Sequence, residues 1–313
     1  MPDSKTPISI DKKVEVLPHF QLETLPERPQ PKPFALVLLR VFFRIAGWIV
    51  PGLAARLALS LFARPRVRAR HKYSDEILES AKIFEILYGN IILKGYEWGE
   101  GKETVLLVHG WESRGTALRS FVPGLLKAGY RVVTFDGPAH GDSQGKRTDL
   151  VHFAGAVKAV INKVGGVRHI ITHSFGGSTT VFALSYLAPE ISIDKLVLIA
   201  VPASTRKVVR DYLKMIAMPH PGRVRFRDML QNRYHHLSFN SVDVEHSLAN
   251  ANVNKVLVVH DRSDTAVPFE SAERIFENHA HVSMLVTHGF GHYLLVKQKP
   301  VIERVTAFIC DGQ

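Results

Sequence analysis

One short stretch, VRHIITHSFGGST at residues 167–179, constrains the fold more than any other part of the chain. It passes from an apolar, β-branched segment typical of a buried strand into a segment of helical composition that starts at Ser178. Only residues 173–177 separate the two, so the chain must reverse sharply with Ser174 at the apex. Small neighbours such as Gly176 permit the close backbone approach that this turn requires. The stretch therefore predicts a nucleophile elbow, with the Ser174 hydroxyl raised above a sheet.

An ordinary strand-to-helix turn is the alternative interpretation, in which Ser174 only caps the helix. The elbow pattern G-x-S-x-G is also imperfect, because Thr172 occupies its first glycine position. Threonine is larger than glycine but still small, so the turn is strained and not excluded. The rest of the chain has to decide between the two interpretations.

Apolar runs alternate with helical stretches from about Ile86 onward. Most of these runs are solid Val, Ile and Leu without alternation, which is typical of strands covered on both faces. The pattern predicts an α/β fold with a mostly parallel sheet wrapped by helices. The expected strands are residues 91–98, 105–109, 131–135, 169–172, 196–200, 256–259 and 282–287. The expected helices are residues 115–127, 150–164, 178–187, 271–279 and 301–309.

The first 85 residues precede this pattern. Residues 1–33 are polar and rich in proline, and we expect a disordered tail there that carries no secretory signal. Residues 34–85 form an N-terminal helical extension in this interpretation. Its apolar part, 34–63, is interrupted by Arg40, Arg44 and Arg56 and bent by Pro51, which predicts two amphipathic helices meeting at Pro51 and no spanning helix. These helices either pack on the main domain, which we favour, or lie in a membrane interface.

A basic run at residues 64–72 follows the two helices. It would attract an anionic lipid headgroup layer, or it is a solvated connector. The formal net charge of +11 favours contact with anionic surfaces in general. We expect no nucleic-acid partner, because the run lacks interleaved aromatic residues and no nucleic-acid-binding motif is visible.

The main domain is expected at residues 86–313, with an insertion at about 205–252. No strong strand occurs between Pro202 and Asn254, while residues 208–218 and 225–234 look helical. An insertion of this size after a central strand is typical of a lid over an active site. Its many arginines and lysines would attract an acidic substrate or form a solvated face.

Neither a metal nor a cofactor is expected. Cys310 is the only cysteine, which excludes an internal disulfide and a cysteine metal cluster and is compatible with a cytoplasmic, reducing location. His288 and His292 are four residues apart, but Gly289 and Gly291 make a metal-binding helix improbable there. No phosphate loop or dinucleotide fingerprint is present.

Candidate functional residues follow the expected strands, because open α/β sheets bind ligands beyond the carboxyl ends of their strands. Gly110 allows a tight turn that leaves the amide of Trp111 free, beside the amide of Phe175, to face a developing oxyanion. Asp136 and Asp142 lie in a glycine-bearing loop, and we interpret both as structural.

The acid and the base of a triad have two candidates each. Asp264 has the loop position of an acid that reaches a histidine, and we favour it over Asp261, which is nearer the strand end. His292 lies in a glycine-flanked loop before the last helix and could swing over Ser174. His288 is the second candidate for the base.

These motifs resemble those of the α/β-hydrolase superfamily from about Gly95 to Phe308. The residues that carry the resemblance are HGW at 109–111, DGPAHGDS at 136–143, THSFG at 172–176, HDRSDTAVP at 260–268 and GFGH at 289–292. The resemblance implies Ser174 as nucleophile, His292 as general base and acid, and Asp264 as its partner, in the chain order of the superfamily. Thr172 and Asp261, which stands where the family motif has glycine, are departures from the pattern.

The resulting expectation is a serine hydrolase that acts on a small acyl substrate, namely a carboxylic ester, thioester or amide. Two alternatives stay open: a scaffold that binds an acyl ligand or a membrane surface without turnover, and an acyltransferase. Dehalogenase and epoxide hydrolase chemistry is disfavoured, because those relatives need an aspartate at the position of Ser174.

Overall fold

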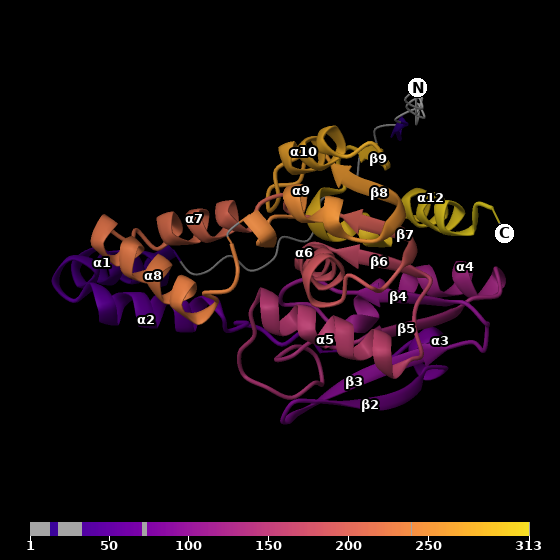
Figure 1. The fold of residues 1–313 in the computed structure, drawn as a ribbon, viewed down its shortest axis with the longest axis horizontal. Coiled ribbons are helices and arrows are strands. Elements are labelled where there is room, and N and C mark those ends of the chain that lie inside the picture. Colours follow the sequence, from indigo (N-terminus) through magenta and orange to yellow (C-terminus); the bar gives the residue numbers. More distant parts are fainter. Residues whose placement is uncertain (1–12, 18–32, 71–73, 239, 313) are drawn as a thin grey trace, which may run out of the picture.

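The computed structural model describes residues 13–17, 33–70, 74–238 and 240–312. A nine-stranded sheet with the order β1-β9-β8-β7-β6-β4-β5-β3-β2 crosses the molecule (Figure 1). Strand β3 pairs antiparallel with both β2 and β5, and the other neighbours are parallel. The strands are β1 (Val14–Val16), β2 (Lys82–Tyr88), β3 (Ile91–Trp98), β4 (Thr104–Val108), β5 (Arg131–Phe135), β6 (His169–His173), β7 (Ile193–Ile199), β8 (Val253–Asp261) and β9 (Val282–Thr287).

Helices cover both faces of the sheet, as the continuous apolar strands predict. Side chains of α5, α6, α9 and α10 form a core on one face, and those of α4 and α12 form a core on the other. We call the sheet with these helices the α/β body. Its helices are α3 (Glu76–Glu79), α4 (Val122–Lys127), α5 (Leu150–Lys163), α6 (Phe175–Phe182), α9 (Val244–Ser247), α10 (Glu270–Asn278), α11 (Gly291–Leu294) and α12 (Lys299–Cys310).

Two strands differ from the expected organisation. Val14–Val16 lies within the expected tail, yet it pairs with β9 at the edge of the sheet. The expected domain start at residue 86 falls inside β2, which pairs with β3 from Lys82 to Tyr88. Both strands lie at sheet edges, where one face stays solvated and the apolar signal is weak. The rest of the expected tail, 1–12 and 18–32, lies outside the described residues.

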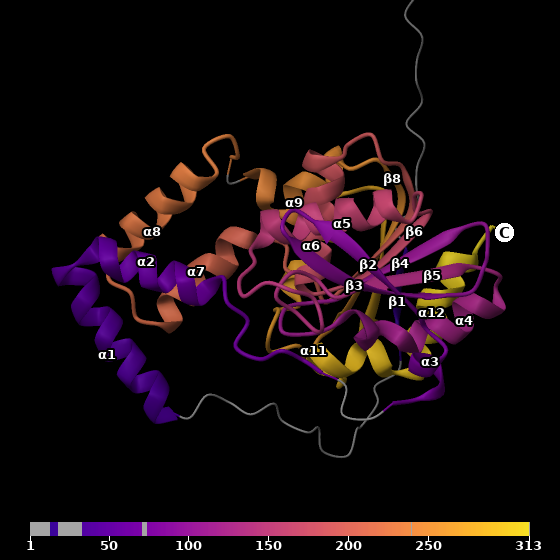
Figure 2. The ribbon, with the colours of Figure 1, turned by 90° about the horizontal axis from the view of Figure 1, so that it is seen from below.

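Four helices form a separate lobe beside the sheet (Figures 1 and 2). They are α1 (Pro33–Ile49) and α2 (Pro51–Phe62) from the extension, and α7 (Thr205–Met215) and α8 (His220–Arg233) from the insertion. The two predicted helices meeting at Pro51 are thus confirmed, because proline begins α2 and cannot continue α1. We call this unit the helical lobe. The role of the insertion as a lid over the site stays a prediction.

A third apolar core holds the helical lobe together. Phe43 of α1 and Ala55 of α2 are fully buried against Leu213, Ile216 and Phe226 of the insertion. The extension therefore packs on the insertion, which is the part of the main domain that supplies its partner. Within the described residues, none of the helices combines the length and the apolar character needed to cross a bilayer.

The basic run after α2 binds to loops of the α/β body. Arg66 donates from its backbone N–H and its guanidinium to the carboxylate of Glu112, with a shortest distance of 2.8 Å. Arg68 donates to the carbonyl of Gly145, and the Arg70 carbonyl accepts from Arg114 at 3.3 Å. Lys72 lies outside the described residues. The run is thus a connector attached to the protein through these contacts, while its four described arginines stay exposed.

Candidate active site

The turn between β6 and α6 has the geometry of a nucleophile elbow. Ser174 adopts φ 52° and ψ −124°, a left-handed backbone conformation that is rare for a residue with a side chain. A Cβ atom at Gly176 would lie 2.5 Å from the carbonyl oxygen of His109, so glycine is needed where α6 approaches β4. Thr172 fits the first glycine position, because its hydroxyl donates to the Val197 carbonyl at 2.8 Å. Within residues 172–177, backbone strain from a positive φ therefore falls on Ser174.

Three predicted residues form a continuous hydrogen-bonded chain. The Ser174 hydroxyl donates to Nε2 of His292 at 3.0 Å, and Nδ1 of His292 donates to Oδ2 of Asp264 at 2.7 Å. We assign the proton to Nδ1 because the carboxylate can only accept. Asp264 is buried, whereas Ser174 is half-buried. The arrangement is that of a nucleophile, a base and an orienting acid.

The loop around Asp264 keeps its carboxylate ionised. Burial alone would raise the pKa of Asp264, but the hydrogen bond from His292 and the N–H of Val267 hold that pKa below its ordinary value of 3.8. Its Oδ1 accepts from the backbone N–H groups of Ala266 and Val267, each at 2.8 Å. Nε2 of the buried His260 donates to the Val267 carbonyl at 2.9 Å, which fixes the far side of the loop.

Asp261, the second candidate for the acid, has a different task. Its carboxylate accepts from the Thr287 hydroxyl at 2.6 Å and from the N–H groups of Ser263, Gly289 and Phe290. Burial opposes ionisation, but these donors lower the pKa of Asp261. Asp261 therefore joins the end of β8 to the segment that leads to His292. This explains why an aspartate replaces the glycine of the family motif.

His292 lies in a more ordered segment than the sequence suggested. The glycine-flanked segment was expected to be a loop, but α11 begins at Gly291, which has φ 60°, and includes His292. Short helices of one turn lack the periodic signal that longer helices show. Nε2 of His173 donates to the backbone carbonyl of His292 at 3.0 Å, so the residue before Ser174 also holds His292 in place. His288, the other candidate, is exposed.

Trp111 and Phe175, the residues expected to supply the oxyanion donors, are in contact through their rings. Phe175 is the first residue of α6, and its N–H has no carbonyl one turn earlier to donate to. The rings of Trp111 and Phe175 meet edge to face with centroids 5.3 Å apart. A Cβ at Gly110 would lie 3.0 Å from that of Ser174, so glycine allows the loop after β4 to approach the nucleophile.

Two buried histidines support this loop, a role that the motifs containing them did not predict. Nε2 of His140 accepts from the N–H of Glu112 at 3.0 Å, and Nε2 of His109 accepts from the N–H of Gly137 at 2.9 Å. Burial lowers the pKa of His140 to about 4 and also lowers the pKa of His109, so both rings are neutral acceptors at pH 7. The available sign of this role in the sequence was that each histidine follows an apolar strand, β4 for His109 and β5 for His140.

Asp136 and Asp142 have the structural role expected of them. The Asp136 carboxylate accepts from the N–H groups of Gly115 at 2.7 Å and Asp142 at 2.8 Å. Burial raises the pKa of Asp136, although these donors oppose that effect. The two aspartates thus shape the loop after β5, and the bonds to Gly115 and Asp142 occupy the Asp136 carboxylate.

One group in the described part of the chain brings three metal-ligating side chains together. Ligand atoms of Asp243, Glu245 and His246 lie within 4.8 Å of one another. Asp243 accepts from Ser204 and Arg206, and Glu245 pairs with Arg274. These carboxylates are therefore already neutralised by partners from the chain itself.

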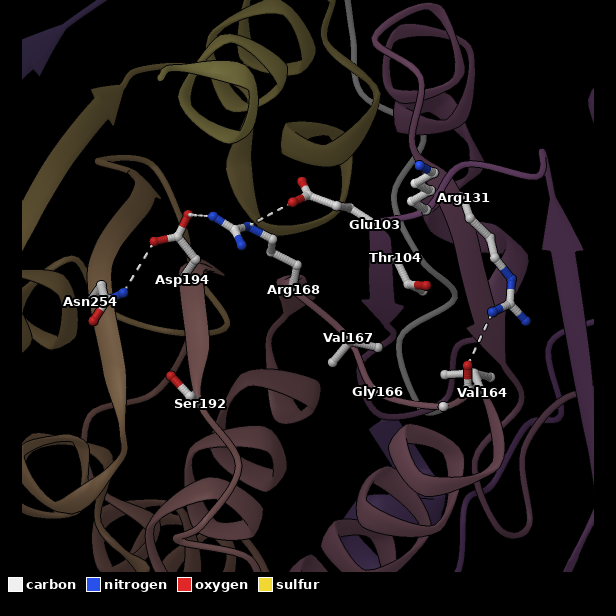
Figure 3. A pocket seen from close by; sticks show the side chains of 12 residues that line it. Glu103, Thr104, Arg131, Val164, Gly166, Val167, Arg168, Ser192, Asp194 and Asn254 are labelled. Carbon is white, nitrogen blue, oxygen red and sulfur yellow. Dashed lines mark hydrogen bonds and ion pairs between the residues drawn. The ribbon is translucent and has the colours of Figure 1, made fainter. Parts of the chain in front are cut away.

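A polar cavity of about 550 Å³ lies at the amino ends of the parallel strands, whereas Ser174 follows the carboxyl end of β6 (Figure 3). Its charged groups pair with one another: Arg168 contacts Glu103 and Asp194, and Asn254 donates to Asp194. Its lining contains neither Ser174 nor His292. The cavity is therefore separate from the hydrogen-bonded chain of the candidate active site.

Comparison with known proteins agrees with this geometry. Residues 105–285 match the Alpha/beta hydrolase family. The 2-hydroxy-6-oxononadienedioate/2-hydroxy-6-oxononatrienedioate hydrolase 1 of Pseudomonas putida is 26% identical over 264 residues, which cover 69% of this chain and 91% of that protein. The corresponding hydrolase of Klebsiella pneumoniae is 37% identical over 110 residues, which cover 32% of this chain and 36% of that protein.

Solved structures show the same fold. An esterase from Pyrococcus furiosus superposes with a TM-score of 0.59 at 22% identity, covering 80% of this chain and 96% of its own. A meta-cleavage product hydrolase from Pseudomonas fluorescens gives a TM-score of 0.53 at 19% identity, covering 74% and 98%. The predicted fold class, a mostly parallel sheet wrapped by helices, is confirmed.

Proposed function

The chain belongs to the Alpha/beta hydrolase family, and from this membership we propose that it is a serine hydrolase that forms an acyl-enzyme on Ser174. The substrate class that we favour is a carboxylic ester, with thioesters and amides as related substrates. The observation that carries the proposal is the hydrogen-bonded chain from Ser174 through His292 to Asp264. A serine that only caps a helix does not need a hydrogen bond to a histidine that is itself bonded to a buried carboxylate.

The reaction follows from these contacts. Oγ of Ser174 attacks the substrate carbonyl carbon while Nε2 of His292 takes the hydroxyl proton, and Asp264 stabilises the imidazolium that forms. The amides of Trp111 and Phe175 stabilise the oxyanion, each by about 3 kcal/mol. His292 then gives the proton to the leaving oxygen, and the bond between this oxygen and the carbonyl carbon breaks. In the second half, His292 deprotonates a water that attacks the acyl carbon. The bond between this carbon and Oγ of Ser174 then breaks, Oγ takes the proton back from His292, and the carboxylic acid leaves.

A second candidate function is hydrolysis of a conjugated oxo acid at a carbon–carbon bond. The similarity to the Pseudomonas putida hydrolase over most of this chain favours it. The substrate in that protein's name carries two carboxylates and an oxo group. The same serine, histidine and aspartate would act, and the substrate alone would differ.

Labelling and turnover together test the proposal. A fluorophosphonate probe should label the wild type but not Ser174→Ala. It should also label Ser178→Ala, the control, which removes a buried serine of α6. Nitrophenyl esters of graded chain length should be cleaved by the wild type, and Ser174→Ala should reduce kcat by at least about 10³-fold. Labelling that survives Ser174→Ala would refute the nucleophile.

Other outcomes identify the alternatives. Turnover of a 2-hydroxy-6-oxo dienoate in preference to every ester would favour carbon–carbon hydrolysis. Partition of the acyl group to an added alcohol in preference to water would identify an acyltransferase. A labelled Ser174 without turnover of either substrate class would favour a scaffold that binds and does not catalyse.

A further inference from the structure

The outer face of α1 is apolar along its whole length. Leu39 and Phe43 pack in the core of the helical lobe and Leu36 is half-buried, whereas eight other large apolar side chains of α1 are exposed. Phe34 is 72% exposed, Trp48 64% and Ile49 73%. The other exposed apolar residues of this face are Val37, Leu38, Val41, Phe42 and Ile45. Soluble monomers seldom expose a contiguous apolar surface of this kind without a partner for it.

Figure 2 shows α1 at the outer margin of the helical lobe, on the side away from the sheet. Arg40 and Arg44 are the only charged residues of α1. On a helical projection both lie between the inward stripe of Phe43 and the outward stripe of Val41 and Ile45. The helix therefore has an apolar outer face with a cationic border.

A cationic cavity of about 380 Å³ opens at this border. Four basic side chains line it, together with Trp48, and no carboxylate contributes to its lining. The four are Arg40 and Arg44 of α1, Lys214 of α7 and Arg223 of α8. Among the described residues, no carboxylate lies within ion-pair distance of Arg40, Arg44 or Lys214. Asp211 of α7, which forms its ion pair with Lys207 at 2.9 Å, is near enough for the charge of Lys214 to help lower its pKa. Clustered like charges cost free energy, which an anion would recover.

The walls of this cavity are held together by close backbone packing. A Cβ at Gly47 would lie 2.4 Å from Cδ of Pro219, and a Cβ at Gly222 would lie 3.4 Å from Cα of Gly47. Arg223 is oriented by the hydrogen bond from its Nε to the Met218 carbonyl at 2.6 Å. The spacing of the cations is therefore fixed by the packing of α1 against α8.

We propose that this surface, the outer face of α1 with its cationic cavity, docks the protein on a bilayer that contains anionic phospholipids. The apolar side chains enter the acyl region, and the cavity holds a phosphate-bearing headgroup. Trp48 is part of the apolar face and of the cavity lining, and tryptophan is enriched at the membrane–water interface. An amphipathic helix of this type lies in the plane of the interface and does not span it.

A second copy of the chain is a poorer occupant of the same surface. A symmetric dimer through α1 would place Arg40 and Arg44 of one copy at the face that carries the same residues of the other. The repulsion between these like charges would oppose association. A phospholipid surface matches the apolar face and the cations at the same time.

Vesicle sedimentation tests the proposal with the full chain. The wild type should bind phosphatidylcholine vesicles that contain phosphatidylglycerol, and it should bind pure phosphatidylcholine vesicles at least tenfold more weakly. Arg40→Glu with Arg44→Glu should weaken binding to the mixed vesicles by roughly tenfold or more. Lys127→Glu with Lys163→Glu changes the net charge equally at exposed sites of the α/β body, and it should retain binding.

The apolar contribution has its own matched pair. Val41→Ser with Ile45→Ser should weaken binding at least tenfold, whereas Ile83→Ser with Leu87→Ser, two exposed apolar residues of β2, should not. Ester turnover in solution should be the same in all four variants, and Ser174→Ala should bind vesicles as the wild type does, so this test is independent of the catalytic proposal.

Three results would overturn the proposal. The first is equal loss of binding in the Lys127→Glu, Lys163→Glu control, which would indicate net charge alone. The second is a stable dimer in light scattering that Val41→Ser with Ile45→Ser converts to a monomer. The third is displacement of the protein from mixed vesicles by millimolar inorganic phosphate as effectively as by anionic vesicles, which would identify a free-anion site.

Discussion

In the α/β body, buried carboxylates such as Asp261, Asp264 and Glu112 each accept several hydrogen bonds from the chain itself, those to Glu112 all coming from Arg66. In the helical lobe, Arg40, Arg44 and Lys214 face a cavity without a carboxylate, and large apolar side chains point outward. The two regions share one packing principle, since each has an apolar core of its own. They differ in how their charges are matched: the buried carboxylates of the body have partners within the chain, whereas the cavity of the lobe has four basic side chains and no carboxylate in its lining.

The largest expected effect separates two aspartates of the body. Asp264→Asn should lower kcat on an ester by about 10³- to 10⁴-fold, because an amide cannot hold the proton on Nδ1 of His292 and stabilise the imidazolium. Asp261→Asn should keep kcat within about tenfold and lower stability by about 1–3 kcal/mol, because it weakens the link to Thr287. Steady-state kinetics and urea unfolding measure both. The reverse result would exchange the roles of the two aspartates.

A pH dependence of stability is the second expectation for the body. The pKa of His140 is about 4 in the folded protein against an ordinary value of 6.5, so between these values the unfolded chain binds a proton that the folded chain does not. Stability should be fully present above pH 6.5 and decrease by roughly 3 kcal/mol as the pH falls to 4. His140→Gln, which can still accept from the N–H of Glu112, should lose less. Equal losses of unfolding free energy in the wild type and in His140→Gln between pH 6.5 and pH 4 would contradict the prediction.

The packing of the lobe gives a third, smaller effect. Gly47→Leu should destabilise the protein by about 1–3 kcal/mol, because its side chain would collide with Pro219. Gly52→Ala is the matched control on α2, where a Cβ meets nothing within 4 Å. Limited proteolysis should cleave α1 and α2 sooner in Gly47→Leu, while turnover of a soluble ester stays within about twofold. Equal stability of the two variants would show that the helical lobe tolerates a wider spacing between α1 and α8.

The connector between the two regions should give the smallest effect. Arg66→Ala removes the guanidinium bonds to Glu112, the residue after Trp111, and leaves the bond from the Arg66 backbone N–H. It should lower kcat a few-fold, as expected for an ion pair with one exposed member. Arg66→Lys should recover part of the loss. An unchanged kcat would show that the loop after β4 keeps its shape without the connector.

The sequence was sufficient for most of the body and for the turn at Ser174. Residues 91–98, 131–135 and 282–287 were expected as strands and are strands with those bounds. Long apolar strands and helices carry strong local signals, whereas β1 has three residues and α11 has four. Segments this short are determined by tertiary contacts, so their composition does not reveal them.

The candidate site shows the same limit. Chain order and strand ends pointed to Ser174, Asp264 and His292, and the structure places them in one hydrogen-bonded chain. The sequence could not show that Asp261 holds the segment before His292, or that His140 supports the loop at Glu112. Both depend on contacts between residues far apart in the chain. Their residue types alone are compatible with many roles.

The helical lobe joins α1 and α2 to α7 and α8, which follow them by well over a hundred residues. During translation the first pair leaves the ribosome on the order of ten seconds before its partners exist. Throughout that interval the sides of α1 and α2 that pack on α7 and α8, Phe43 among them, have no insertion to cover them. The nascent protein therefore exposes this apolar surface until residues 205–233 have been synthesised.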